Sequence, residues 1–222
     1  MANKEKAEVQ DINRSMYDFR YEEKDTDFYK IQEGLTKDIV LEISEKKGDP
    51  AWMRDFRLKS LEIYNQKKVP QWGPSIDGLD MNNIVTYVKP KTKMTADWEE
   101  VPEDIKNTFE KLGIPQAERE SLAGVGAQYD SELVYHNLQK EVEEQGVVYT
   151  DIESALHGPY ADMIRDHFMH LVPPTDHKFA ALHGAVWSGG SFVYIPKGVS
   201  VEIPLQSYFR RNAPGAGQFE HT

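Results

Sequence analysis

Residues 179–219 read FAALHGAVWSGGSFVYIPKGVSVEIPLQSYFRRNAPGAGQF, and this stretch decides the fold. Within it four aliphatic residues occupy alternate positions: Val199, Val201, Ile203 and Leu205. Because successive side chains of a strand point to opposite faces, this spacing predicts a strand with one buried and one solvated face. A second β-rich run, SFVYI, ends at the turn signal Pro-Lys-Gly. Short strands joined by tight corners fit a sandwich, a barrel or a β-solenoid.

The chain before this stretch has the pattern of helices and connectors. Thr36 is a suitable N-cap for a helix that ends at Gly48, and Asp49-Pro50 begins a second helix. Apolar residues at three- and four-residue spacing predict another helix over residues 131–145. Asp151 is placed to cap a short helix after that.

The clearest boundary is Val172-Pro173-Pro174, because two prolines cannot continue a helix. We therefore expect a disordered tail over residues 1–14, a mainly helical domain over 15–172 and a β-structured core that starts over 173–222. The predicted class is α+β, with a helical region followed by β-structure.

Composition narrows the function classes. The chain has 222 residues, 39% of them hydrophobic and 28% charged, which is typical of a soluble globular protein. Its formal net charge of −11 argues against nucleic-acid binding, which needs clustered Lys and Arg. The sequence shows neither a secretory signal nor an apolar run of about 20 residues, so we expect no membrane contact and a cytoplasmic location. Cysteine is absent, which excludes disulfides, thiolate metal sites and cysteine nucleophiles from this chain.

The run over residues 184–222 closely resembles the opening of the β-helical core of the SufB/SufD family of iron–sulfur cluster assembly scaffolds, in its SufB form. The segments VGAQYDSE at 125–132 and 172–182 resemble the same family in the same order. The resemblance covers most of the chain from Tyr17 onward and implies a right-handed parallel β-helix whose first coils lie over residues 173–222. Family members are considerably longer, so we expect this chain to be an N-terminal portion.

The resemblance also implies a function and partners. Such a scaffold receives sulfur from a cysteine desulfurase system and builds nascent Fe–S clusters together with SufC, an ABC-type ATPase, and the paralogous SufD. The scaffold is not an enzyme, because ATP hydrolysis belongs to SufC. The cysteine that the family uses is expected beyond Thr222, so this chain by itself should hold no cluster.

Arg210 and Asn212 are the polar pair that we single out. Two positions apart on a strand, they share a face. A guanidinium and an amide that point inward could steer a persulfide or polysulfide anion, and the resemblance places such a sulfur-transfer path in this part of the family pattern. A solvated strand end is the alternative interpretation.

Histidines are the other candidates for chemistry. His167 and His170 are spaced to share a helix face, and His177 and His183 follow. Neither HExxH nor an equivalent motif accompanies them, so we interpret them as surface or helix-terminal residues and predict no metal site.

Two rival functions remain open. One is a β-helical polysaccharide-acting enzyme in which Trp187 and Tyr194 stack on sugars and carboxylates supply acid–base catalysis. The other is a pure protein-binding module. An unpaired coil edge would also expose backbone N–H and C=O groups, so we expect homodimerisation through that edge.

Overall fold

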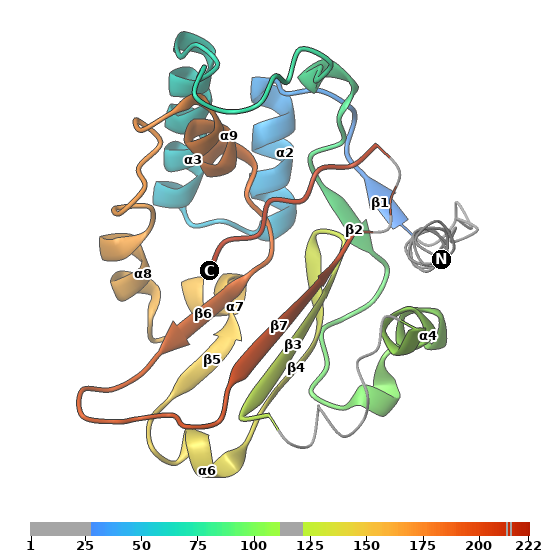
Figure 1. Cartoon of the computed structure of the whole chain (residues 1–222), viewed down its shortest axis with the longest axis vertical. Coiled ribbons are helices and arrows are strands. Elements are labelled where there is room, and N and C mark those ends of the chain that lie inside the picture. Colours follow the sequence, from blue (N-terminus) through green and yellow to red (C-terminus); the bar gives the residue numbers. More distant parts are fainter. Residues whose placement is uncertain (1–27, 112–121, 212, 214) are drawn as a thin grey trace, which may run out of the picture.

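The computed structural model describes residues 28–111, 122–211, 213 and 215–222 (Figure 1). The predicted tail over residues 1–14 lies outside this part of the chain. The elements follow one another in this order: β1 (Phe28–Lys30), α2 (Lys37–Lys47), α3 (Ala51–Gln66), η1 (Met81–Asn83), β2 (Val88–Pro90), η2 (Trp98–Glu100), α4 (Glu103–Lys111), β3 (Gly124–Tyr129), β4 (Glu132–Leu138), α6 (Lys140–Glu143), β5 (Val148–Asp151), α7 (Ile152–Leu156), α8 (Ala161–His167), α9 (Lys178–Val186), β6 (Ser191–Tyr194) and β7 (Leu205–Arg210).

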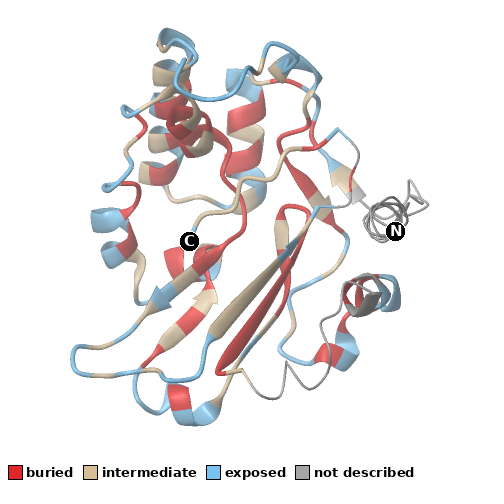
Figure 2. Ribbon diagram, viewed as in Figure 1, coloured by how far each residue is buried: buried red, intermediate tan, exposed pale blue. Residues whose placement is uncertain are grey.

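Three small sheets contain the strands. The largest has the order β4-β3-β7, in which β3 pairs antiparallel with β4 and parallel with β7. Strands β5 and β6 form an antiparallel pair, as do β1 and β2. All six residues of β3 are buried, which makes this strand the centre of the sheet (Figure 2).

The helices α2, α3 and α9 gather at one end of the molecule (Figure 1). The hydroxyl of Thr36 accepts a hydrogen bond from the N–H of Ile39, and Gly48 ends α2 in the left-handed conformation at φ 66°. Both caps confirm the predicted limits of this helix. Gly184 of α9 lies against Ser60 of α3, where an added Cβ would come within 2.6 Å of the serine hydroxyl. The close approach of these two helices therefore depends on a residue without a side chain.

Trp187, directly after α9, is the largest completely buried side chain described. Its indole N–H points at the Met53 sulfur at 3.4 Å, and its ring centroid lies 5.1 Å from that of Phe168. This burial is incompatible with the rival prediction that Trp187 stacks on a sugar, because 0% of the residue is exposed. The aromatic residue belongs to the core, where truncating such a side chain typically costs about 3–5 kcal/mol.

Two predictions of secondary structure are wrong. Residues 131–145 do not form one helix, because β4 covers Glu132–Leu138 and only Lys140–Glu143 are helical. Asp130 adopts φ 54° and turns the chain from β3 back onto itself, so backbone pairing with β3 overrides the helical spacing. Residues 178–186, expected to belong to the β-region, form α9 instead.

The alternating segment that opens the β-region is also irregular, and regular pairing starts only at Leu205. Val199, Val201 and Leu205 nevertheless pack against the buried cluster around Val142 and Val147, while Ile203 is 42% exposed. Over the described residues, helices and sheets are mixed and no sheet closes into a barrel. The parallel β-helix and the domain limits at residues 15–172 and 173–222 stay predictions.

A buried ion group joins the helices to the sheet. The ammonium of Lys47, at the end of α2, lies 2.9 Å from a carboxylate oxygen of Glu132 in β4 and 2.7 Å from one of Glu153 in α7. The Tyr87 hydroxyl donates to the same Glu132 oxygen. Burial opposes the charge on Lys47, but the carboxylates of Glu153 and Glu132 outweigh it and raise the pKa of the lysine.

Replacing Lys47 by methionine keeps most of the aliphatic stem but leaves two carboxylates close together without their cation. We expect the free energy of unfolding, measured in urea, to fall by about 3–5 kcal/mol. Lys37→Met, at the exposed start of the same helix, is the matched control and should change it by about 0.5 kcal/mol or less. A Lys47→Met variant as stable as this control would contradict the role given to the ion group.

Candidate functional site

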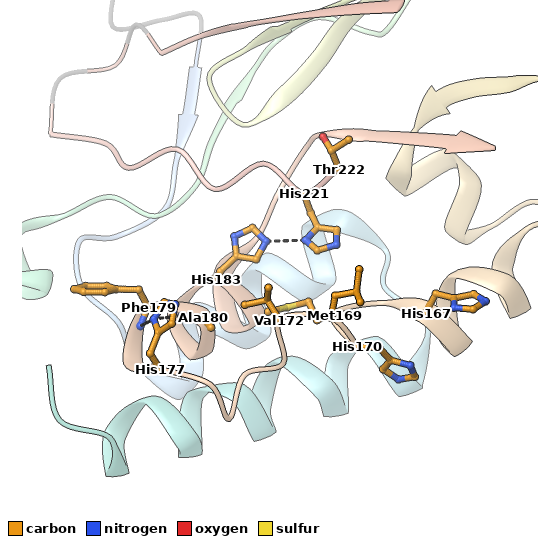
Figure 3. A pocket seen from close by; sticks show the side chains of 11 residues that line it. His167, Met169, His170, Val172, His177, Phe179, Ala180, His183, His221 and Thr222 are labelled. Atoms are coloured by element: carbon orange, nitrogen blue, oxygen red, sulfur yellow. Dashed lines mark hydrogen bonds between the residues drawn. The ribbon is translucent and has the colours of Figure 1, made fainter. Parts of the chain in front are cut away.

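A cavity of about 550 Å³ lies between the chain that follows α8, the first turns of α9 and the segment 217–222 (Figure 3). Five histidines and several apolar residues line it: His167, Met169, His170, Leu171, Val172, His177, Phe179, Ala180, His183, His221 and Thr222. None of these lining residues carries a carboxylate side chain. The described wall is therefore built from imidazoles, one thioether, one phenyl ring, one hydroxyl and aliphatic groups.

Two of the histidines form a direct pair. His183 Nε2 and His221 Nδ1 are 2.8 Å apart, a hydrogen bond in which one ring donates and the other accepts. Figure 3 shows these rings side by side, with His167, His170 and His177 farther along the walls. The His221 ring also lies 4.3 Å from the Phe168 ring, between centroids. The pair thus joins α9 to a segment 38 residues later.

Backbone hydrogen bonds hold that segment against the chain after α9. The N–H of Ser188 donates to the Phe219 carbonyl, the N–H of His221 donates to Gly189, and the N–H of Ser191 donates to the His221 carbonyl. Gly190 adopts φ +105°, and a Cβ added there would lie 2.1 Å from the His221 oxygen. The position of His221 therefore requires a glycine opposite it.

The environment keeps the paired imidazoles neutral. Burial lowers the pKa of His183 to about 4, and the nearby Arg57 contributes in the same direction. Burial likewise lowers the pKa of His221 to about 4, with a further contribution from His183. At pH 7 both rings are uncharged, so each retains a lone pair that can accept a proton or bind a metal ion.

Arg57 contacts the end of α9, the helix that carries His183. Its guanidinium is completely buried, lies 2.6 Å from an Asp49 oxygen and donates to the Trp187 carbonyl at 2.8 Å. It also stacks 4.7 Å from the Trp187 ring. Its Nη2 makes no hydrogen bond. Since the arginine contacts the end of α9, it holds the helix that carries His183.

The amino-acid sequence is similar to known proteins along most of its length. The family model for the SufBD protein N-terminal region matches residues 42–207. The iron–sulfur cluster assembly protein SufB of Bacillus subtilis (strain 168) is 53% identical over 206 residues, which cover 93% of this chain and 44% of the relative. The iron–sulfur cluster assembly SufBD family proteins of Staphylococcus epidermidis and Staphylococcus aureus (strain USA300) are 50% and 49% identical over the same shares.

The chain belongs to the SufBD family. This confirms the resemblance noted from residues 125–132, 172–182 and 184–222. The chain spans less than half the length of the curated relatives that it matches. None of the described helices is long and apolar enough to cross a bilayer.

For a SufBD family member, the predicted sulfur path lies at the end of β7. Arg210 pairs with Tyr129 of β3 in the register, and its carbonyl accepts a hydrogen bond from Asp130. The guanidinium Nε of Arg210 is buried and makes no hydrogen bond. Asn212 lies outside the described residues, so the structure does not test whether the two side chains share a face.

The histidine predictions fare differently. His167 and His170 are exposed, and His177 caps α9 by accepting from the N–H groups of Phe179 and Ala180, as expected for surface or helix-terminal residues. The contact between His183 and His221 was not predicted. No local pattern could reveal it, because the two positions meet only through the fold. Among the described residues, no three His, Asp or Glu side chains converge as a metal site.

The close contact between Gly190 and His221 can be tested by comparing Gly190 with Gly198, a glycine that also has positive φ but is not crowded. Gly190→Ala and Gly198→Ala both place alanine at positive φ, +105° and +87°, but nothing lies within 4 Å of a Cβ at position 198. We expect Gly198→Ala to lower the free energy of unfolding by about 1–3 kcal/mol, and Gly190→Ala to lower it by about 1–3 kcal/mol more. Equal losses in urea unfolding would show that the segment carrying His221 is not held as described.

Stability should also depend on pH through the paired histidines. Their ordinary pKa of 6.5 falls to about 4 in the fold, so between these values the unfolded chain binds more protons and stability decreases as pH falls. One pKa unit corresponds to about 1.4 kcal/mol, so we expect the coupled pair together to lose roughly 3 kcal/mol or more between pH 7 and pH 4.

The measurement is urea unfolding at a series of pH values. The variant His183→Gln/His221→Gln should show a shallower pH dependence, with a remainder from His136, whose pKa burial also lowers. His167→Gln, an exposed residue of the same cavity, should leave the slope unchanged. A double variant with the slope of the original chain would contradict the assignment.

Proposed function

We propose that this chain acts as the N-terminal region of a scaffold on which nascent Fe–S clusters are assembled, and that it is not itself an enzyme. The observation that carries the proposal is 53% identity over 206 residues to a protein named for iron–sulfur cluster assembly. The nascent cluster is cargo here. Because the chain contains no cysteine, thiolates that hold the cluster would come from other parts of the assembly.

The partners proposed for the complete scaffold are SufC, SufD and a cysteine desulfurase system, acting in the cytoplasm. These follow from the family resemblance. In this scheme the desulfurase supplies sulfur, SufC hydrolyses ATP, and the described region contributes a rigid base. Its buried network supports that role, since Lys47, Glu132 and Glu153 fix helices and strands relative to one another.

Arg210 is the residue that we propose for handling sulfur, together with Asn212. A permanent positive charge with several donors suits a persulfide anion. The buried Nε of Arg210 has no hydrogen-bond partner, which leaves a donor for such an anion. We also propose that the coil begun by β7 continues as a right-handed parallel β-helix, a geometry supported by the parallel pairing of β7 with β3.

A chimera tests this function. The 206 matched residues would replace their counterpart in the Bacillus subtilis relative, and cluster formation would be followed anaerobically by visible absorbance with desulfurase, cysteine and Fe²⁺. We expect the chimera to assemble clusters, and Arg210→Ala to slow assembly by about tenfold or more, the effect of losing one charge-assisted hydrogen bond.

Arg210→Lys and the exposed Arg165→Ala serve as controls for that experiment. The lysine keeps the charge and should restore part of the rate, while Arg165→Ala should have no effect because its side chain is 51% exposed and pairs only with Asp162 and Asp166 among the described residues. A chimera that folds but assembles no cluster would refute the proposed function. Normal assembly with Arg210→Ala would refute the role of the arginine alone.

Self-association is a second property that a specific observation favours. Strand β7 is the edge of its sheet, since among the described strands it pairs only with β3. Phe209 is 37% exposed beside this edge. We propose that two copies pair through it, which light scattering after size exclusion should detect as a dimer at micromolar concentration. A monomer at all concentrations would contradict this.

A further inference from the structure

We propose that the His183–His221 pair is a binding site for a divalent first-row transition metal ion, such as Zn²⁺ or Co²⁺, that enters through the histidine-lined cavity. The inference rests on the placement of two imidazole nitrogens toward each other at 2.8 Å, at a cavity of about 550 Å³. It goes beyond the scaffold function and does not depend on it.

The geometry is close to that of a two-histidine chelate. Metal–nitrogen bonds of about 2.0–2.1 Å at a tetrahedral angle require the two nitrogens to be about 3.3 Å apart. The observed separation of 2.8 Å therefore has to widen by roughly half an ångström, and both rings have to rotate so that their nitrogens point at the ion instead of at each other. Backbone hydrogen bonds to Gly189 and Ser191 hold His221, so the opening comes from rotation of the two side chains and not from movement of α9 or of the segment 217–222.

A metal ion can replace the hydrogen bond between the two rings without a net loss of protons. In the pair one of the two facing nitrogens carries the hydrogen, and metal binding moves that hydrogen to the other nitrogen of the same ring. No net proton is released, because both rings remain neutral imidazoles. Their lowered pKa values mean that protons do not compete for the lone pairs at neutral pH.

The surroundings select the class of ion. The lining side chains offer imidazole nitrogens, the Met169 thioether and the Thr222 hydroxyl, and none of them is a carboxylate, which favours Zn²⁺, Co²⁺, Ni²⁺ or Cu²⁺ over Mg²⁺ and Ca²⁺. Arg57 lies near His183, but Asp49 at 2.6 Å offsets its charge. With two protein ligands fixed in the described structure, water fills the remaining positions, so the ion should bind reversibly and exchange easily.

The experiment uses the chain prepared without a histidine tag and stripped with a chelator. Zn²⁺ is titrated in competition with a chromogenic indicator, and Co²⁺ binding is followed by its visible absorption. We expect one ion per chain. His183→Gln and His221→Gln should each weaken binding by about tenfold or more, since even second-shell changes cost about 10–100-fold.

Matched controls come from the same cavity. His167→Gln and His170→Gln remove exposed imidazoles that line it but lie outside the pair, and both should bind within about twofold of the original chain. Equal weakening by control and pair variants, unchanged binding by the pair variants, or no binding at one equivalent would each overturn the assignment.

A second measurement does not require that the glutamine variants fold. Nitrogen-15 NMR of the imidazole rings in the original chain reports the tautomer of each histidine and the nitrogen that binds metal. On addition of Zn²⁺, the signals of His183 Nε2 and His221 Nδ1 should shift together. Shifts confined to other histidines would refute the site.

Discussion

The ammonium of Lys47 is the group on which the rest of the structure depends. The Lys47 side chain is 3% exposed, and its ammonium bridges carboxylates from a strand and a helix that lie more than 80 residues farther along the chain. Burying this cation costs hydration free energy, and the ion pairs with Glu132 and Glu153 offset that cost. Glu153 in turn accepts from the N–H of Gly189, so the same ion group reaches the turn that follows α9.

The Gly189-Gly190 turn connects the Lys47 ion group to the candidate site. Gln128, in the central strand, accepts from the N–H of Gly190, and both glycines lie so close to neighbouring atoms that a Cβ would clash. The segment 217–222 lies directly against this turn, and its backbone forms hydrogen bonds with residues 188–191. A series of contacts therefore connects the Lys47 ion group, through Glu153 and the Gly189-Gly190 turn, to the segment that carries His221.

Polar groups in the interior are used to hold elements together: Arg57 ties α3 to the end of α9, and Lys47 ties α2 to β4 and α7. The aromatic residue that could have stacked on a substrate, Trp187, is enclosed by Met53, Phe168 and the Arg57 guanidinium. The charged and aromatic groups of the described interior are thus used for packing.

Local sequence determined the features whose physics is local. Thr36, Gly48 and Asp151 end or begin helices because their own side chains or backbone torsions satisfy groups within a few residues. The family could likewise be recognised from contiguous motifs. Only the tertiary structure decided that residues 132–138 form a strand, since β3 must find an antiparallel partner, and that His183 meets His221 across 38 residues. Contacts of that kind depend on which surfaces are buried together, and no window of sequence contains that information.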